Sequence, residues 1–353
     1  MSVNEMTSME RVLNTLQQKE ADRVPFFLLL TLHGAKEMGL GIEAYFSDPE
    51  AVAEGQLRLR KRYGHDCYYT FYHASIEVEA WGGSSIFYAD GPPNAGMPPI
   101  TTSQCIDTLA VPGIDEAEGL QRVLKTQQLL KAEAGDEALI IGVVMSPFSL
   151  PVMQMGFEAY LMLMQQEQDR FQHLMDLNEK FTVAWANAQL AAGAHAICYF
   201  DPVASTTIIP RELYLETGFK VAKRTLPQIN GPIATHMASG RCKGILQDLI
   251  ETGTGVVGVS TDEDLAELKQ IAAGKLTLLG NLNGVTMRRW SSQEAEDEVR
   301  RAIAKAGRGG GFILSDNHGE IPCQVSDEVL QSISDAVHHW GRYPLDWVDG
   351  YVG

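Results

Sequence analysis

The sequence predicts a single domain built as a (β/α)8 TIM barrel, and two observations support this prediction. Eight short apolar, β-rich runs are spread over the 353 residues, and most of them are separated by patterns typical of helices. Strands that alternate with helices in this way favour a closed parallel barrel over an open doubly wound sheet. The runs are Val24–Leu30, Asp66–Tyr72, Leu139–Met145, Ala194–Phe200, Pro232–Met237, Val256–Thr261, Leu276–Leu282 and Phe312–Ser315.

Start and stop signals define several helices around these runs. Residues 1–22 form a polar extension in which Thr7 and Glu10 have capping-box spacing and predict a short helix. Capping residues, a proline at a first helical position and glycines after a last turn predict three further helices. These helices begin at Ser47-Asp48-Pro49-Glu50, Asp262-Glu263-Asp264-Leu265 and Ser291-Ser292-Gln293-Glu294, and they end near Tyr63-Gly64, Ala273-Gly274 and Ala306-Gly307.

Two segments depart from the strict alternation of strands and helices. The stretch Ile76–Pro99 predicts a hairpin insertion after the second strand, because apolar residues alternate from Ile76 to Ala80 before a Gly82-Gly83 turn. This hairpin should overhang the carboxyl-terminal mouth of the barrel. The stretch Phe157–Gln189 predicts one or two long helices.

Composition excludes several classes of protein. Hydrophobic residues make up 45% of the chain, enough for a large core, which excludes a disordered protein. The net charge of −17 and the lack of any lysine- or arginine-rich run argue against nucleic acid or an anionic membrane as a partner. The first 22 residues do not resemble a signal peptide, and no apolar run approaches membrane-spanning length. Five cysteines without C-x-x-C spacing favour a reduced, cytoplasmic protein.

The polar residues that follow the strands form the candidate site. Asp201 follows the run Ala194–Phe200, and His236 lies near the end of the run Pro232–Met237. Because the carboxyl ends of parallel strands meet at one mouth, where barrel enzymes keep their chemistry, we assign catalytic roles to both residues. The Asp201-Pro202 pair is also typical of a simple turn. The predicted substrate-binding residues at other strand ends are Tyr72, His73, Asn281 and Asn317.

The predicted rim combines histidines and aspartates but contains no arginine or lysine. A phosphorylated or polyanionic substrate normally needs a cation or a glycine-rich anion cradle. A divalent metal ion or a neutral substrate suits this set of residues better.

Five stretches of the chain match a known family when they are taken together, in this order and at these spacings. They are Glu77–Gly82 (EVEAWG), Ser146-Pro147-Phe148, Asp201–Ser205 (DPVAS), Gly280-Asn281-Leu282 and Gly309–Ser315 (GGGFILS). With them the chain resembles the uroporphyrinogen decarboxylase superfamily over essentially its whole length. The resemblance implies the (β/α)8 barrel of that family.

The superfamily has two branches, and the resemblance favours the second. In the true decarboxylases, two arginines of the first strand grip the porphyrinogen carboxylates, and Leu30 and Gly34 stand at those positions here. The catalytic aspartate expected after the second strand is absent from Thr70–His73. DPVAS is more typical of the corrinoid-dependent methyltransferases, so the chain is identified as a member of that branch.

The resemblance also implies a metal site. Branch members that methylate a thiol bind zinc through His-x-Cys after one strand and a further cysteine after the last strand. Here His236 keeps the histidine position and Ala238 replaces the first cysteine. Without a gap the last cysteine aligns with Gly319, and a shift of one residue places it on His318. The implied zinc ligands are therefore His236 and His318. The candidates for a third ligand are Asp201, Glu320 and Cys323.

The first functional hypothesis is a zinc-assisted methyltransferase that moves a methyl group between a small methylated substrate, for example a methyl ether, and a corrinoid. Because the chain has no corrinoid-binding motif, the cobalamin would arrive on a separate corrinoid protein, docked over the mouth against the Ile76–Pro99 hairpin. The second hypothesis is a metal-free decarboxylase or lyase of the same fold. A non-enzymatic binding protein is least favoured. The sequence leaves a monomer and a homodimer both open.

Overall fold

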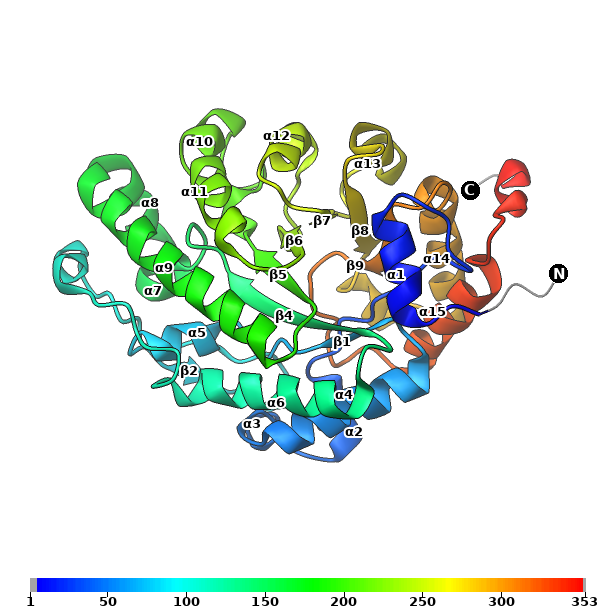
Figure 1. Ribbon diagram of the computed structural model, residues 1–353, viewed down its shortest axis with the longest axis horizontal. Helices are drawn as coiled ribbons and strands as arrows, with labels where there is room; N and C mark the ends of the chain where they lie inside the picture. Colours follow the sequence, from blue (N-terminus) through cyan, green and yellow to red (C-terminus); the bar gives the residue numbers. More distant parts are fainter. Residues whose placement is uncertain (1–4, 352–353) are drawn as a thin grey trace.

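Parallel strands form the centre of the computed structural model, which describes residues 5–351. Within these residues the main sheet has seven strands, and their order, β1-β4-β5-β6-β7-β8-β9, follows the chain. The sheet is curled and helices surround it (Figure 1), so the TIM-barrel-like architecture is confirmed. The strands are β1 (Cys67–Tyr69), β4 (Leu139–Met145), β5 (Ala196–Phe200), β6 (Ile233–His236), β7 (Val256–Gly258), β8 (Thr277–Leu282) and β9 (Phe312–Asp316).

The first apolar run, Val24–Leu30, is not a regular strand, and the prediction of eight strands is wrong at this position. Pro25 has no amide hydrogen to add to a ladder. Phe26 forms an isolated parallel bridge with Leu314 of β9. The Leu314 amide donates to the Pro25 carbonyl at 2.9 Å, and the Asp66 amide donates to the Phe26 carbonyl at 2.9 Å. The run therefore lies between β9 and the start of β1, in the place of an eighth strand.

The predicted helix boundaries are confirmed. Helix α1 (Ser8–Leu16) begins with the Thr7–Glu10 capping box. Helix α4 (Pro49–Tyr63) begins after Asp48 and ends at Gly64, which has a φ of 64°. The other helices are α2 (His33–Met38), α3 (Ile42–Ser47), α5 (Ser75–Ala80), α6 (Glu118–Ala134), α7 (Pro151–Met155), α8 (Phe157–Gln166), α9 (Gln168–Ala192), α10 (Arg211–Glu216), α11 (Gly218–Thr225), α12 (Leu246–Glu251), α13 (Leu265–Ala272), α14 (Ser292–Ala306) and α15 (Asp327–Trp340).

The insertion after β1 is a helix followed by a short hairpin, so the first arm of the predicted hairpin is wrong. Its residues form α5, and the antiparallel pair consists of β2 (Ser85–Ile86) and β3 (Asn94–Ala95). In an alternating strand Glu77 would lie on the face opposite to Ile76 and Val78. Instead, its carboxylate is buried and accepts the Met145 amide hydrogen at 2.8 Å. The helical turn of α5 thereby brings a carboxylate to the carboxyl end of β4.

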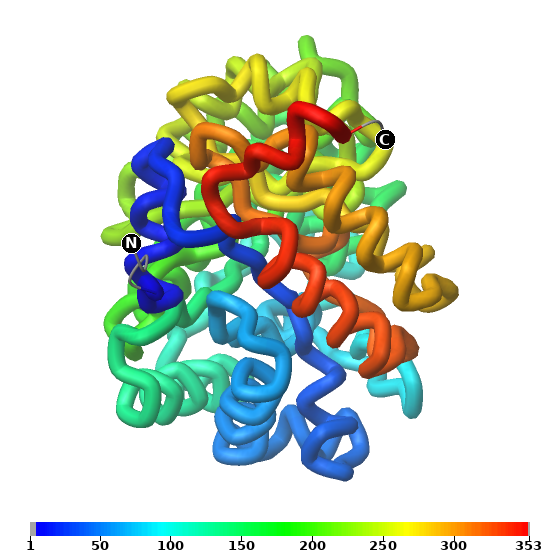
Figure 2. The backbone as a smooth tube through the Cα atoms, turned by 90° about the vertical axis from the view of Figure 1, so that its right-hand side faces the viewer, coloured from blue at the N-terminus to red at the C-terminus, as the bar shows by residue number. Residues whose placement is uncertain are grey.

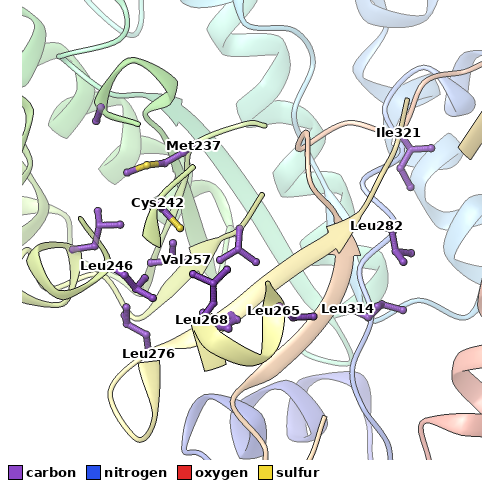
Figure 3. Packing of buried hydrophobic residues seen from close by; sticks show 14 of the residues in the cluster. Met237, Cys242, Leu246, Val257, Leu265, Leu268, Leu276, Leu282, Leu314 and Ile321 are labelled. Atoms are coloured by element: carbon purple, nitrogen blue, oxygen red, sulfur yellow. The ribbon is translucent and has the colours of Figure 1, made fainter. Parts of the chain in front are cut away.

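The largest apolar cluster packs helices against the strands. On the side of β7, Leu246 of α12 and Leu268 of α13 lie in the same buried cluster as Val257 (Figure 3). Met237 and Cys242 extend this cluster into the loop after β6. The core therefore reaches directly beneath the residues that follow β6. No helix among residues 5–351 is long and apolar enough to cross a membrane.

Segments from the two ends of the chain lie side by side at the amino-terminal end of the barrel. Arg23 and Arg342 form an antiparallel bridge, and the Val24 amide donates to the Gly341 carbonyl at 2.9 Å. In Figure 2 the blue N-terminal segment accordingly runs beside the red C-terminal segment. These contacts close the barrel at the end opposite to the candidate site.

Candidate active site at the carboxyl ends of the strands

Three stacked rings lie at the carboxyl ends of the strands. Phe200 is the last residue of β5 and His236 the last of β6, and their ring centroids are 4.8 Å apart at an interplanar angle of 16°. Phe71 stacks on Phe200, with the two ring centroids 6.0 Å apart. A Cβ atom at Gly258 would lie 2.4 Å from the His236 ring, and one at Gly319 would lie 2.2 Å from the Phe200 ring. Glycine at these two positions therefore leaves room for the stack.

His236 is fully buried and held by a backbone hydrogen bond. The Ala238 amide, two residues further on, donates to His236 Nδ1 at 3.0 Å. Ala238 has a φ of 49°, a conformation that non-glycine residues rarely adopt. His236 Nε2 is buried and has no hydrogen-bond partner among the described residues. Burial, followed by the nearby His318, lowers the pKa of the imidazole to about 4, so the ring is neutral at neutral pH.

A chain of polar contacts joins the loops around the mouth. Ser239, just after β6, hydrogen-bonds through its hydroxyl to Nδ1 of His318, which follows β9. The Ser260 hydroxyl donates to the Ser239 carbonyl at 2.8 Å. The Asn281 side-chain amide donates to the Ser260 carbonyl at 3.0 Å. These contacts bring His236, His318 and Asn281 to one mouth, as predicted. His318 Nε2, like His236 Nε2, has no partner among residues 5–351.

Two carboxyl groups lie at the carboxyl end of the last strand: Asp316, the buried last residue of β9, and Glu320, which is half-buried four residues further on. Asp316 Oδ2 accepts the amide hydrogens of His318 and Gly319, both at 2.8 Å, whereas its Oδ1 has no partner in the described chain. Burial raises the pKa of Asp316 to about 6. Glu320 is hydrogen-bonded by the Thr31 hydroxyl, and burial raises its pKa to about 7. Both groups are therefore poised to exchange protons near neutral pH.

The backbone of Asp201 lies beside that of His236, but the carboxylate of Asp201 is hydrogen-bonded to the loop after β4. The Asp201 amide donates to the His236 carbonyl at 2.8 Å. Its Oδ1 accepts the hydroxyl hydrogens of Ser146 and Ser149, both at 2.6 Å, from the loop after β4. Burial raises the pKa of this carboxyl group to about 6. These bonds give Asp201 a role in joining the loops after β4 and β5.

The predicted substrate-binding residues separate into two groups. Tyr72 directs its hydroxyl to α6, where it lies 2.6 Å from Thr126 Oγ1. His73 Nδ1 lies 2.9 Å from Ser75 Oγ, and its ring packs against Phe87 in the insertion. These two side chains are not brought to the His236 stack. Asn281 is joined to the loop after β6 through Ser260, and Asn317 directly follows β9, so both lie at the same mouth as the stack. Asn317 Oδ1 is buried without a partner in residues 5–351.

Comparisons with known proteins place the chain in a family. Residues 7–340 match the family described as Uroporphyrinogen decarboxylase (URO-D). The chain belongs to the URO-D family. Uroporphyrinogen decarboxylase of Methylococcus capsulatus is 26% identical over 306 residues, which cover 83% of this chain and 85% of that relative. The corresponding enzyme of Legionella pneumophila (strain Lens) is 24% identical over 345 residues, which cover 92% and 95%.

Solved structures agree on the fold. A methyltransferase from Methanosarcina mazei superposes with a TM-score of 0.85 at 19% identity, covering 95% of this chain and 99% of that one. A B12-independent methionine synthase from Shewanella sp. superposes with a TM-score of 0.54 at 11% identity, covering 82% and 86%. At these identities the likeness concerns the fold.

Within this URO-D fold the mouth carboxylates have no cationic partners. Hydroxyl groups and backbone amides, and no lysine or arginine, donate hydrogen bonds to Asp201, Asp316 and Glu320 in the described chain. The sequence predicts no lysine or arginine at the strand ends. This prediction holds for the hydrogen-bond donors to these three carboxyl groups. A polycarboxylate substrate would meet carboxylates here without a compensating charge.

Sequence reasoning did not assign roles to several residues that the structure brings to the mouth. Phe71 and Phe200 lie within predicted apolar strands, where a site role and a core role give the same pattern. Ser239 gave no signal, because its contact with His318 crosses 79 positions of sequence. Asp316 stands at a predicted strand end, and this position was its only signal.

The residues present do not form a ready metal site. Within residues 5–351 no group of three or more histidine, cysteine, aspartate or glutamate side chains is arranged to hold one ion. Cys323 directs its thiol to the Asp90 carbonyl at 3.5 Å. The Nε2 atoms of His236 and His318 have no partner in the described part of the chain, but His236 Nδ1 accepts a hydrogen bond where zinc-bound histidines normally donate one. Zinc therefore stays a prediction from the resemblance, and no catalytic step is derived through it.

Proposed function

We propose that this URO-D family member is a methyltransferase that moves a methyl group between a small methylated substrate and a corrinoid carried by a separate protein. The proposal gives His236 and the unpartnered polar atoms after β9 the task of holding the group from which the methyl leaves. Reduced cobalt on the corrinoid partner would supply the electron pair that forms the new bond to the methyl carbon.

One observation supports this proposal over porphyrinogen decarboxylation: no lysine or arginine of residues 5–351 donates a hydrogen bond to Asp201, Asp316 or Glu320, the carboxyl groups after β5 and at the end of β9. The mouth carboxylates accept only from hydroxyls and backbone amides in the described chain. A porphyrinogen carries several carboxylates, and each would need a cationic or strong neutral donor once removed from water. The relatives named above are decarboxylases, so this chain would have kept their fold and changed the chemistry of the mouth.

Exposed apolar side chains suggest where the corrinoid partner docks. Ile86 and Met97 of the β2–β3 insertion are 47% and 66% exposed, and Phe157 and Ile208, after β4 and β5, are 44% and 43% exposed. Phe157 and Ile208 line one shallow apolar cavity together with Met153. All of these residues follow the carboxyl ends of strands. Apolar surface on the mouth side is the kind of surface that a partner protein covers.

The test mixes the purified protein with cob(I)alamin and a panel of O-, N- and S-methyl compounds. We expect methylcobalamin to appear, followed by its absorption spectrum, with one chemical class of donor. A corrinoid protein should accelerate the reaction, and Phe157→Asp should reduce that acceleration without changing the rate with free cobalamin. Full turnover in the absence of any cobalamin would contradict the proposal.

A metal-free decarboxylase or lyase is the second candidate, and the carboxyl groups after β9 favour it. Asp316 and Glu320 have pKa values raised by burial to about 6 and about 7, so either can deliver a proton at neutral pH. A lyase of this kind would act on a small neutral substrate, and a decarboxylase on a small monocarboxylic acid. Release of carbon dioxide from small carboxylic acids, measured without cobalamin, tests this alternative.

A further inference from the structure

The hydrogen bond at His236 Nδ1 fixes which ring nitrogen carries the proton. A backbone amide can only donate a hydrogen bond, so Nδ1, 3.0 Å from the Ala238 nitrogen, must accept. The neutral ring therefore carries its hydrogen on Nε2. This assignment follows from the two heavy atoms and the chemistry of the amide.

Packing also fixes the plane of the ring. Phe200 stacks on one side at 4.8 Å, and the backbone of Gly258 lies so close that a Cβ atom there would be 2.8 Å from Nε2. The Ala238 amide faces the ring at Nδ1 in the turn after β6, where Ala238 has a left-handed φ of 49°. Packing thus sets the plane of the ring, and the hydrogen bond from the Ala238 amide selects which nitrogen faces that amide within the plane.

We propose that His236 of this chain is a hydrogen-bond donor through Nε2 to the heteroatom that bears the transferred methyl group, and not a zinc ligand. A metal ion at Nε2 would require the proton to move to Nδ1, where it would face the Ala238 N–H. The proposal depends on the proposed methyl transfer for the identity of the acceptor. The tautomer and the lack of zinc do not depend on it.

The step balances without zinc. The bond between the methyl carbon and the heteroatom breaks, and its electron pair stays on the heteroatom. The methyl carbon receives its new pair from the reduced cobalt of the corrinoid partner. The Nε2–H group stabilises the charge that develops on the heteroatom without giving up its proton, as a preorganised donor does. Water protonates the product after it leaves.

The first measurement is the tautomer of His236 in the full-length protein, read from the ¹⁵N chemical shifts of labelled histidines, with His236→Gln used to assign the signals. We expect the Nε2–H form. The second is zinc content after incubation with excess zinc and removal of loosely bound metal. We expect no stoichiometric zinc in the wild type. Zinc that binds at one ion per chain and is lost in His236→Gln, or an Nδ1–H tautomer, would overturn the proposal.

Activity then tests the role of the donor. His236→Ala should lower kcat by about 10²–10³-fold, the usual cost of removing one preorganised donor. His236→Gln keeps an N–H donor and should recover part of the loss, whereas it could not replace a metal-binding imidazole. Circular dichroism and a urea unfolding curve for each variant exclude misfolding. If no methyl transfer is found with any donor, the tautomer and zinc results still decide the state of His236, and only the proposed function fails.

Discussion

Asp66 and Asp316 are both buried aspartates of the barrel, one just before β1 at the amino-terminal end and one at the carboxyl end of β9. Asp66 accepts hydrogen bonds from Arg11, Arg23, the Ser8 hydroxyl and the Phe26 amide, at 2.6–3.0 Å. Asp316 accepts only backbone amides on Oδ2, and its Oδ1 has no partner among residues 5–351.

The pKa values of the two groups shift in opposite directions. Burial alone would raise the pKa of Asp66, but Arg23 and then Arg11 lower it below its usual value. At Asp316 burial dominates and raises the pKa to about 6. A charge with all its partners inside the chain stabilises the fold, whereas an unpartnered one is available to a ligand. The comparison therefore assigns stability to the amino-terminal end and binding to the mouth.

The largest expected effect comes from replacing each of the two carboxyl groups by an uncharged amide. Asp66→Asn should lower the free energy of unfolding by about 3–5 kcal/mol, because two buried arginines lose their counter-charge and the new NH2 group faces donors. Asp316→Asn should change stability by less than about 1 kcal/mol, since its amide oxygen can still accept the two backbone hydrogens. Urea unfolding of both variants measures this difference. Equal losses would contradict the assignment of roles.

The buried Glu77 at the end of β4 tests the same comparison through pH. Burial raises its pKa to about 8, opposed by the hydrogen bond from the Met145 amide. The folded state thus holds the proton more tightly than the unfolded chain, whose pKa is near 4.5. The stability that this group contributes is fully present below about pH 4.5 and is lost as pH rises through about 8.

Glu77→Gln should therefore gain stability relative to wild type as pH rises from about 5 to about 9, by a few kcal/mol, with little difference at the acid end. Unfolding curves in urea across this range measure the gap. Glu54→Gln changes an exposed carboxylate on α4 and serves as the control, with a gap that should stay constant. A constant gap for Glu77→Gln as well would show that Glu77 is ionised in the folded protein.

Gly309 and Gly319 have similar backbone conformations, but only Gly319 lies against the ring stack. Replacing each by alanine therefore distinguishes the free-energy cost of backbone strain from the cost of disturbing the stack. Gly319 has a φ of 85°, and a Cβ atom there would lie 2.2 Å from the Phe200 ring. Gly309 has a φ of 77° and open space around its Cα. Gly309→Ala should cost about 1–2 kcal/mol for the left-handed conformation alone. Gly319→Ala should cost a further 1–3 kcal/mol, roughly, for overpacking and should also lower activity.

The fold could be predicted well where local chemistry determines it. The Asp48-Pro49 start and the Gly64 end of α4 depend on neighbouring residues, and both are confirmed. Val24–Leu30 was wrong as a regular strand because Pro25 removes an amide that a ladder needs. The first arm of the hairpin was wrong because the Met145 amide, distant in sequence, supplies the partner that draws Glu77 inside.

The candidate site could be predicted only as far as strand ends locate residues. His236 and His318 come to one mouth because parallel strands end at the same edge of the sheet. The direction of a side chain beyond a strand end is set by tertiary contacts, as the bonds from Ser146 and Ser149 to Asp201 show. The tautomer of His236 depends on the hydrogen bond from the Ala238 amide, which the sequence does not signal.

Tyr72 provides the smallest expected effect and the sharpest check on which aromatic residues belong to the mouth. Its hydroxyl lies 2.6 Å from Thr126 Oγ1, and β1 already ends at Tyr69, so the alternation of the strand no longer directs Tyr72. Tyr72→Phe should lower the free energy of unfolding by about 1 kcal/mol and leave kcat and KM unchanged. Tyr69→Phe is the matched variant, because the Tyr69 hydroxyl donates to the Gly319 carbonyl at 2.9 Å and so holds the loop that carries His318. It should cost a similar free energy but also lower kcat. A rise in KM for Tyr72→Phe, with Tyr69→Phe unaffected, would place the substrate against α6 instead of the His236 stack.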